Sequence, residues 1–62
     1  MTLEDRIWND LVKRKRFCTA RQISSRLQVP LATVRAFVNG WANRQILDVI
    51  IKDRTYYYRI KE

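Results

Sequence analysis

The sequence predicts a small α+β domain, mainly α-helical, in which three helices precede a C-terminal two-stranded β-hairpin. Apolar residues recur at helical spacing through the first two thirds of the chain, and capping sequences begin two of these segments. The last third is instead rich in β-branched and aromatic residues on either side of a polar turn. The chain has 62 residues, of which 47% are hydrophobic. We therefore expect residues 1–62 to form one domain with one small core.

The first helix is expected to begin at Thr2, whose hydroxyl can accept a free backbone N–H, with Glu4 and Asp5 at the positive end of the helix dipole. Its apolar stripe consists of Leu3, Ile7, Trp8, Leu11 and Val12. The basic residues 13–16 follow at its C-terminal end. Cations are favoured at that end, and the same run is equally suited to binding phosphate.

The second helix is expected over residues 20–27, because Thr19 and Gln22 form a capping box. Pro30 lacks an amide hydrogen and suits the start of a further helix, which we expect over residues 31–42. The buried side of this third helix is expected to comprise Val34, Phe37, Val38 and Trp41. Gly40 then lies inside its last turn or eases its exit.

Residues 46–51 and 56–60 are expected to form the two strands, joined by the polar turn 52–55. The turn lacks Asn-Gly or Asp-Gly, so the sequence does not predict its type. Alternation puts Tyr56 and Tyr58 on one face and leaves Tyr57 as the tyrosine expected to be exposed. Upstream, residues 17–18 form a short apolar link or a minimal strand, in which the cysteine is expected to be buried.

Several functional classes are excluded by composition. The chain has no histidine and one cysteine, so it offers no His-based proton transfer, no His/Cys metal site and no internal disulfide. We therefore expect no catalytic residues, no cofactor and no small-molecule substrate, and a reducing, cytoplasmic compartment. No apolar run approaches the roughly 18 residues of a membrane span.

The distribution of charge indicates a polyanionic partner. The net charge is +7, and residues 11–47 contain eight Lys and Arg but no acidic residue. A solvated surface normally mixes both signs, so nucleic acid is the leading partner, followed by an acidic protein or a membrane surface. Ordinary solubilising charge is the alternative.

Residues 23–37 resemble a helix-turn-helix of bacterial repressors, with apolar residues where its two helices pack together. Those positions hold Ile23, Leu27, Val29, Val34 and Phe37. Ser24 replaces the more usual alanine, and Gln28 replaces a common glycine, so the turn is expected to be slightly altered. With the hairpin that follows, residues 3–61 resemble a winged helix-turn-helix domain of no identified subfamily.

This resemblance implies a bacterial or phage DNA-binding protein that regulates transcription or replication. In that family the third helix enters the major groove of double-stranded DNA and the wing touches the backbone or the minor groove. Here these elements are helix 31–42 and wing 52–55, with the wing expected on the backbone. The DNA-binding residues implied are Leu31, Ala32, Thr33, Arg35, Asn39, Arg21, Arg26, Arg44, Lys52 and Arg54. Arg35 is the main candidate for base readout, since arginine can pair with guanine and asparagine with adenine.

Two other functions remain open. A protein-interaction module could use the same scaffold, through an apolar patch at Leu31, Ala32 and Ala36 or through edge pairing of the wing strand with a partner or a second copy. An RNA or single-strand binder could use the basic face and Tyr57.

Overall fold

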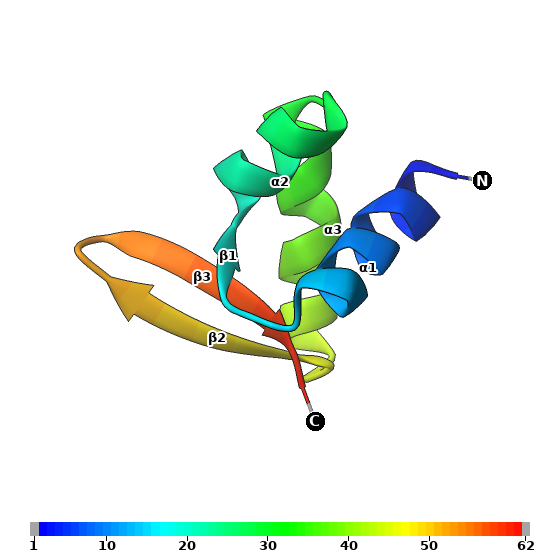
Figure 1. The fold of residues 1–62 in the computed structure, drawn as a ribbon. Helices are drawn as coiled ribbons and strands as arrows, with labels where there is room; N and C mark the ends of the chain where they lie inside the picture. Colours follow the sequence, from blue (N-terminus) through cyan, green and yellow to red (C-terminus); the bar gives the residue numbers. More distant parts are fainter. Residues whose placement is uncertain (1, 62) are drawn as a thin grey trace.

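Three helices and three antiparallel strands make up the part of the chain that the computed structural model describes, residues 2–61. The elements are α1 (Leu3–Arg14), β1 (Cys18–Thr19), α2 (Ala20–Leu27), α3 (Leu31–Asn43), β2 (Leu47–Lys52) and β3 (Thr55–Ile60). Figure 1 shows the helices gathered at one end of the molecule, with the hairpin β2–β3 projecting away from them.

The helix boundaries follow from local hydrogen bonds at the predicted caps. The Thr2 hydroxyl accepts from the Asp5 backbone N–H at 3.1 Å, and Lys15, in the left-handed conformation at φ 53°, ends α1. At the start of α2, the Thr19 hydroxyl accepts from the Gln22 N–H at 3.0 Å, and the Thr19 N–H donates to Gln22 Oε1 at 3.2 Å. The capping box and the predicted bounds of α2 are thus confirmed.

The connection between α2 and α3 is a tight turn that includes a residue with positive φ. Gln28, at φ 55°, occupies the left-handed region that usually favours glycine. The Ser24 hydroxyl donates to the Val29 carbonyl at 2.6 Å, which holds the turn against α2. Pro30 caps α3, and its carbonyl accepts the N–H groups of Thr33 and Val34.

The sheet has three strands in the order β1-β3-β2. The predicted hairpin is present, but the prediction of only two strands was wrong, and the minimal strand considered at residues 17–18 lies at Cys18–Thr19. The two residues of β1 pair with the middle of β3, Cys18 opposite Tyr58 and Thr19 opposite Tyr57. A strand this short carries no periodicity of its own, and it forms because β3 offers a second edge. Because Thr19 also caps α2, the sheet leads directly into that helix.

The hairpin turn consists of Asp53 and Arg54, which lie between the paired residues Lys52 and Thr55. Both turn residues have positive φ, 51° and 63°, as a type I′ turn requires. At the other end of β2, the left-handed residue after α3 is Gln45, at φ 62°, whereas Gly40 lies inside the helix with ordinary φ.

The core lies between the three helices and the sheet. Its fully buried side chains are Ile7, Leu11, Ile23, Val34 and Val38. Trp41 packs edge-on against Trp8 at 5.1 Å and stacks on Phe37 at 5.9 Å between ring centroids, so these rings serve packing as their spacing predicts. Leu3 and Val12, which belong to the apolar stripe of α1, are 42% and 41% exposed.

The tyrosines of β3 differ from the prediction in one respect. Tyr58 is buried, but Tyr56, on the same face nearer the tip, is 53% exposed. Tyr57 is half-buried, so it is not the exposed member of the three. The reason is that the helices cover only the part of this face nearest α3, and Tyr56 lies beyond them. Cys18 is buried, as predicted.

Candidate nucleic-acid interface

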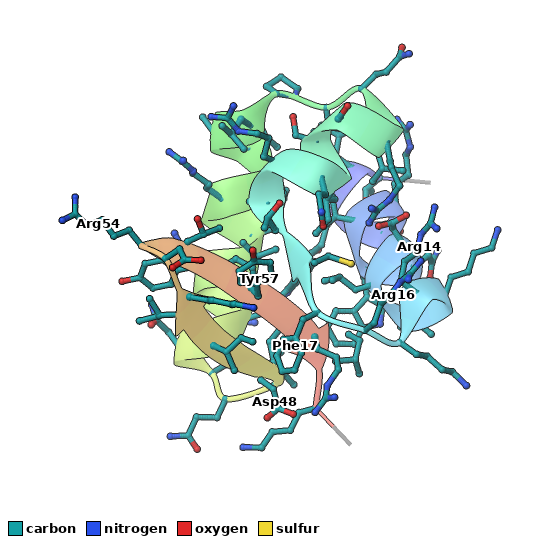
Figure 2. The ribbon with its side chains drawn as sticks, turned by 60° about the vertical axis from the view of Figure 1, so that its left-hand side comes forward. Arg14, Arg16, Phe17, Asp48, Arg54 and Tyr57 are labelled. Atoms are coloured by element: carbon teal, nitrogen blue, oxygen red, sulfur yellow. The ribbon has the colours of Figure 1, made fainter. Side chains whose placement is uncertain are left out.

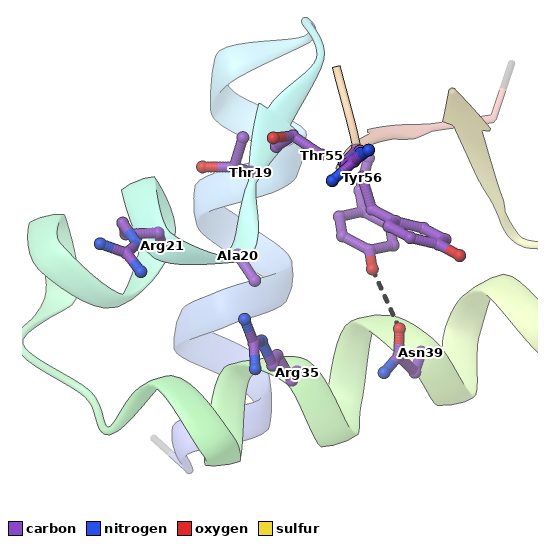
Figure 3. Close-up of a pocket in the computed structure, with 9 residues that line it drawn as sticks. Thr19, Ala20, Arg21, Arg35, Asn39, Thr55 and Tyr56 are labelled. Atoms are coloured by element: carbon purple, nitrogen blue, oxygen red, sulfur yellow. Dashed lines mark hydrogen bonds between the residues drawn. The ribbon is translucent and has the colours of Figure 1, made fainter. Parts of the chain in front are cut away.

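A concave surface lies between α3, the start of α2 and the tip of the hairpin (Figure 3). The pocket that it encloses has a volume of about 760 Å³. It is lined by Thr19, Ala20, Arg21, Arg35, Asn39, Arg54, Thr55, Tyr56 and Tyr58. Four of the ten residues predicted to bind DNA meet here, from α2, α3 and the hairpin turn: Arg21, Arg35, Asn39 and Arg54. We refer to this as the concave surface below.

The middle of α3 supplies Arg35 and Asn39. Each directly follows a fully buried valine, Val34 or Val38, and successive residues on a helix point about 100° apart. Packing of the two valines therefore turns both polar side chains out of the core. Their spacing of four residues places them on one side of the helix, as predicted.

The other two residues come from α2 and from the hairpin tip. Arg21 lies in the first turn of α2, which the capping box at Thr19 fixes next to β1. Arg54 stands in the type I′ turn, where Figure 2 shows its side chain at the tip of the hairpin, directed away from the helices. Both side chains are exposed, and neither takes part in an ion pair among residues 2–61.

Asn39 is held in place by the sheet. The Tyr58 hydroxyl donates to Asn39 Oδ1 at 2.9 Å, the bond drawn dashed in Figure 3. Burial raises the pKa of the Tyr58 phenol, with a smaller effect from Tyr56, while the Arg35 charge lowers it; the phenol thus stays protonated as a donor at neutral pH. Because Oδ1 already accepts this bond, the Nδ2 hydrogens of Asn39 are available to donate outward.

The concave surface is strongly positive. Three arginines line it and no acidic residue does. The first turns of α2 and α3 carry no acidic side chain either, so the positive ends of their dipoles are not neutralised locally. A ligand fitting this surface needs acceptor oxygens and negative charge.

Arg26 is engaged elsewhere. Its guanidinium bonds both oxygens of Asp10, at 3.3 Å from Nε and 2.6 Å from Nη2, and Arg14 approaches the same carboxylate at 3.8 Å. The hydrogen bond to Asp10 raises the pKa of Arg26, so the pair is ionic. This pair joins α1 to α2, as does the bond from Arg6 to the Leu27 carbonyl at 3.1 Å.

The remaining predicted residues lie outside the concave surface. Leu31 is half-buried and packs against the core, and Thr33 is half-buried in the same first turn of α3. Ala32 is exposed in the same turn. Arg44 caps the C-terminus of α3, and Lys52 is exposed at the end of β2, one residue before the turn.

Sequence reasoning did not include Thr55, Tyr56 and Tyr58 among the site residues. The alternation of β3 places Tyr56 on the same face as Tyr58, and this face is turned toward α3. That alternation could have predicted Tyr56 and Tyr58 as site residues. Thr19 was expected mainly as a cap, and the structure confirms that role while also placing it at the rim of the concave surface.

Within residues 2–61, no group of three or more His, Cys, Asp or Glu side chains is arranged to hold a metal ion. Nor does any described helix have the length and apolarity needed to cross a membrane. Comparison of the chain with protein-family models, with curated proteins and with solved structures gives no match.

Proposed function

We propose that this chain is a winged helix-turn-helix DNA-binding domain that regulates transcription or replication. The observation that carries the proposal is the convergence of Arg21, Arg35 and Arg54 on one acid-free concave surface, which Asn39 also lines. In this proposal α2 and α3 are the helix-turn-helix, α3 enters the major groove, and the hairpin β2–β3 is the wing. The partner is double-stranded DNA, and no cofactor is required.

The residues divide into two roles. Arg21, in the first turn of α2, and Arg54, in the hairpin turn, neutralise phosphates and position the domain. Arg35 reads a base, since its guanidinium can donate two hydrogen bonds to guanine O6 and N7. Asn39, whose Oδ1 is occupied by Tyr58, donates from Nδ2 to a purine N7 rather than pairing bidentately with adenine.

The proposal is tested by fluorescence anisotropy with a labelled random-sequence duplex, titrated at several salt concentrations against single-stranded DNA and RNA competitors. We expect micromolar duplex binding with a log–log salt slope that includes about −0.9 for each phosphate contacted. Absent duplex binding, or stronger competition by RNA or single strands, would reject the proposal.

The roles are separated by comparing Arg35→Ala with Arg44→Ala in site selection. Each variant loses one positive charge from α3 or its cap, but only Arg35 lines the concave surface. We expect Arg35→Ala to lose about 1–3 kcal/mol of discrimination at one base pair. Arg44→Ala should keep the sequence preference. Equal preferences in the two variants would remove α3 from the base-reading role.

A further inference from the structure

Strand β2 lies at an edge of the sheet and is mainly apolar, with one acidic and one basic residue. It pairs only with β3 among the described strands. Its side chains at Val49, Ile50 and Ile51 are 38%, 43% and 63% exposed. An exposed apolar edge without proline is a template for pairing with another strand.

The backbone groups at this edge follow from the hairpin. Lys52 and Thr55 flank the two-residue turn as a hydrogen-bonded pair, and at the far end the Lys61 N–H donates to the Ile46 carbonyl at 3.2 Å. Hydrogen-bonded pairs alternate along an antiparallel ladder, so even-numbered residues of β2 bond to β3. The N–H and C=O groups directed to the free edge are therefore those of Leu47, Val49 and Ile51.

A second copy of β2 is self-complementary to this edge in one register. Antiparallel pairing must join odd-numbered residues to odd-numbered ones, because those carry the free groups. Centring the pair on Ile50 places Val49 opposite Ile51 and Asp48 opposite Lys52, twice by symmetry. Moving the centre by one residue toward either end leaves Asp48 or Lys52 opposite Ile50. Only the register centred on Ile50 places apolar side chains opposite apolar ones and the acidic residue opposite the basic one.

Side chains on both faces support this register. Asp48 lies 3.2 Å from Arg59 and is still 36% exposed, and Figure 2 shows it on the face turned away from α3. Arg59 is in turn held over the Phe17 ring at 4.4 Å. An incoming Lys52 therefore meets a fixed carboxylate. On the other face, exposure rises from 4% at Leu47 to 63% at Ile51, which leaves apolar surface for the second copy to cover.

We propose that β2 is a self-association edge at which two copies pair antiparallel about a two-fold axis at Ile50, forming one continuous sheet. Residues opposite each other share a face, so the axis is perpendicular to the sheet and both sets of helices lie on the same side. This self-association does not depend on DNA binding. One strand buries less than the about 1,200–2,000 Å² of stable complexes, so association is concentration-dependent.

Sedimentation equilibrium of the full chain from micromolar to millimolar concentration tests the association. The average mass is expected to rise from 7.5 kDa toward twice that value. Amide hydrogen exchange locates the interface: the Val49 and Ile51 amides gain protection with concentration, whereas the Ile50 amide is protected throughout. A constant mass across this range, or unchanged exchange at Val49 and Ile51, overturns the proposal.

Two variants test the register. Lys52→Glu places two carboxylates opposite each other and should keep the mass at that of one chain. Arg54→Glu makes the same charge change in the turn, outside the paired strand, and should associate like the wild type. Val49→Pro removes an N–H that only the second copy uses, so it should stay monomeric with an unchanged circular dichroism spectrum. Undiminished association of Lys52→Glu overturns the register, whether or not the proline variant folds.

Discussion

Replacing Arg54 by glycine is expected to stabilise the fold and weaken DNA binding at the same time. Arg54 has φ 63°, in the turn type that prefers Asn-Gly or Asp-Gly. The left-handed conformation costs a residue with a side chain about 1–2 kcal/mol. Glycine removes that strain but adds freedom to the unfolded chain, which costs about 0.4–1 kcal/mol. The net gain is about 0.5–1 kcal/mol, or about 2–8 °C in Tm for a domain of this size.

Thermal unfolding by circular dichroism and the salt dependence of duplex binding measure the two effects. Loss of one phosphate contact should reduce the salt slope by about 1. Arg54→Ala is the matched control: it removes the same charge but keeps the strain, so its slope should fall without a rise in Tm. Equal Tm values for the glycine and alanine variants would refute the strain argument. An unchanged slope in both would refute the phosphate contact.

Three further variants test the core, the cap and the pH dependence. Tyr58→Phe should lose about 1 kcal/mol of unfolding free energy in a urea titration at neutral pH, because one hydrogen bond to Asn39 is lost. Burial raises the pKa of Tyr58 above 10.0, so the unfolded chain ionises this phenol first; wild-type stability should fall as the pH rises from 10.0 through the folded value, and less steeply in Tyr58→Phe. Thr19→Ala should lose about 0.5–2 kcal/mol with its cap, and an unchanged urea midpoint would contradict that role. Ile23→Ala should lose about 2–5 kcal/mol, much of the about 3–9 kcal/mol expected for this length, so a cooperative transition like that of the wild type would contradict its place in the core.

The helices were predictable because their signals are local. The hydroxyl of Thr19 and the amide of Gln22 define the start of α2 within four residues of sequence, and Pro30 marks the start of α3 in the same way. The burial of a helix face was less predictable, because it depends on which other elements pack against that face. Leu3 and Val12 continue the apolar stripe of α1, but they lie outside the surface that α2 and the sheet cover.

The third strand and the ion pair between Arg26 and Asp10 depend on contacts between residues that are distant in sequence. Cys18 and Thr19 become a strand only because β3 returns beside them. Arg26 and Arg21 both appear as exposed arginines of one helix, and only the approach of Asp10 from α1 distinguishes them. The placement of Arg35 and Asn39 on the outer side of α3 was predictable, since it follows from helical periodicity; the bond from Tyr58 that orients Asn39 was not.

The central position of β3 in the sheet has a consequence for folding, because both neighbouring strands must pair with it. The hairpin β2–β3 closes over a two-residue turn, an event that takes about 1–10 μs in isolated hairpins. Pairing of Cys18 with Tyr58 closes a much longer loop, whose entropy must be lost before its contacts form. Until the hairpin docks, the apolar faces of α1 and α2 lack the sheet that covers them. We therefore expect docking of the preformed hairpin onto the helices to be rate-limiting, with β1 completed in the same step.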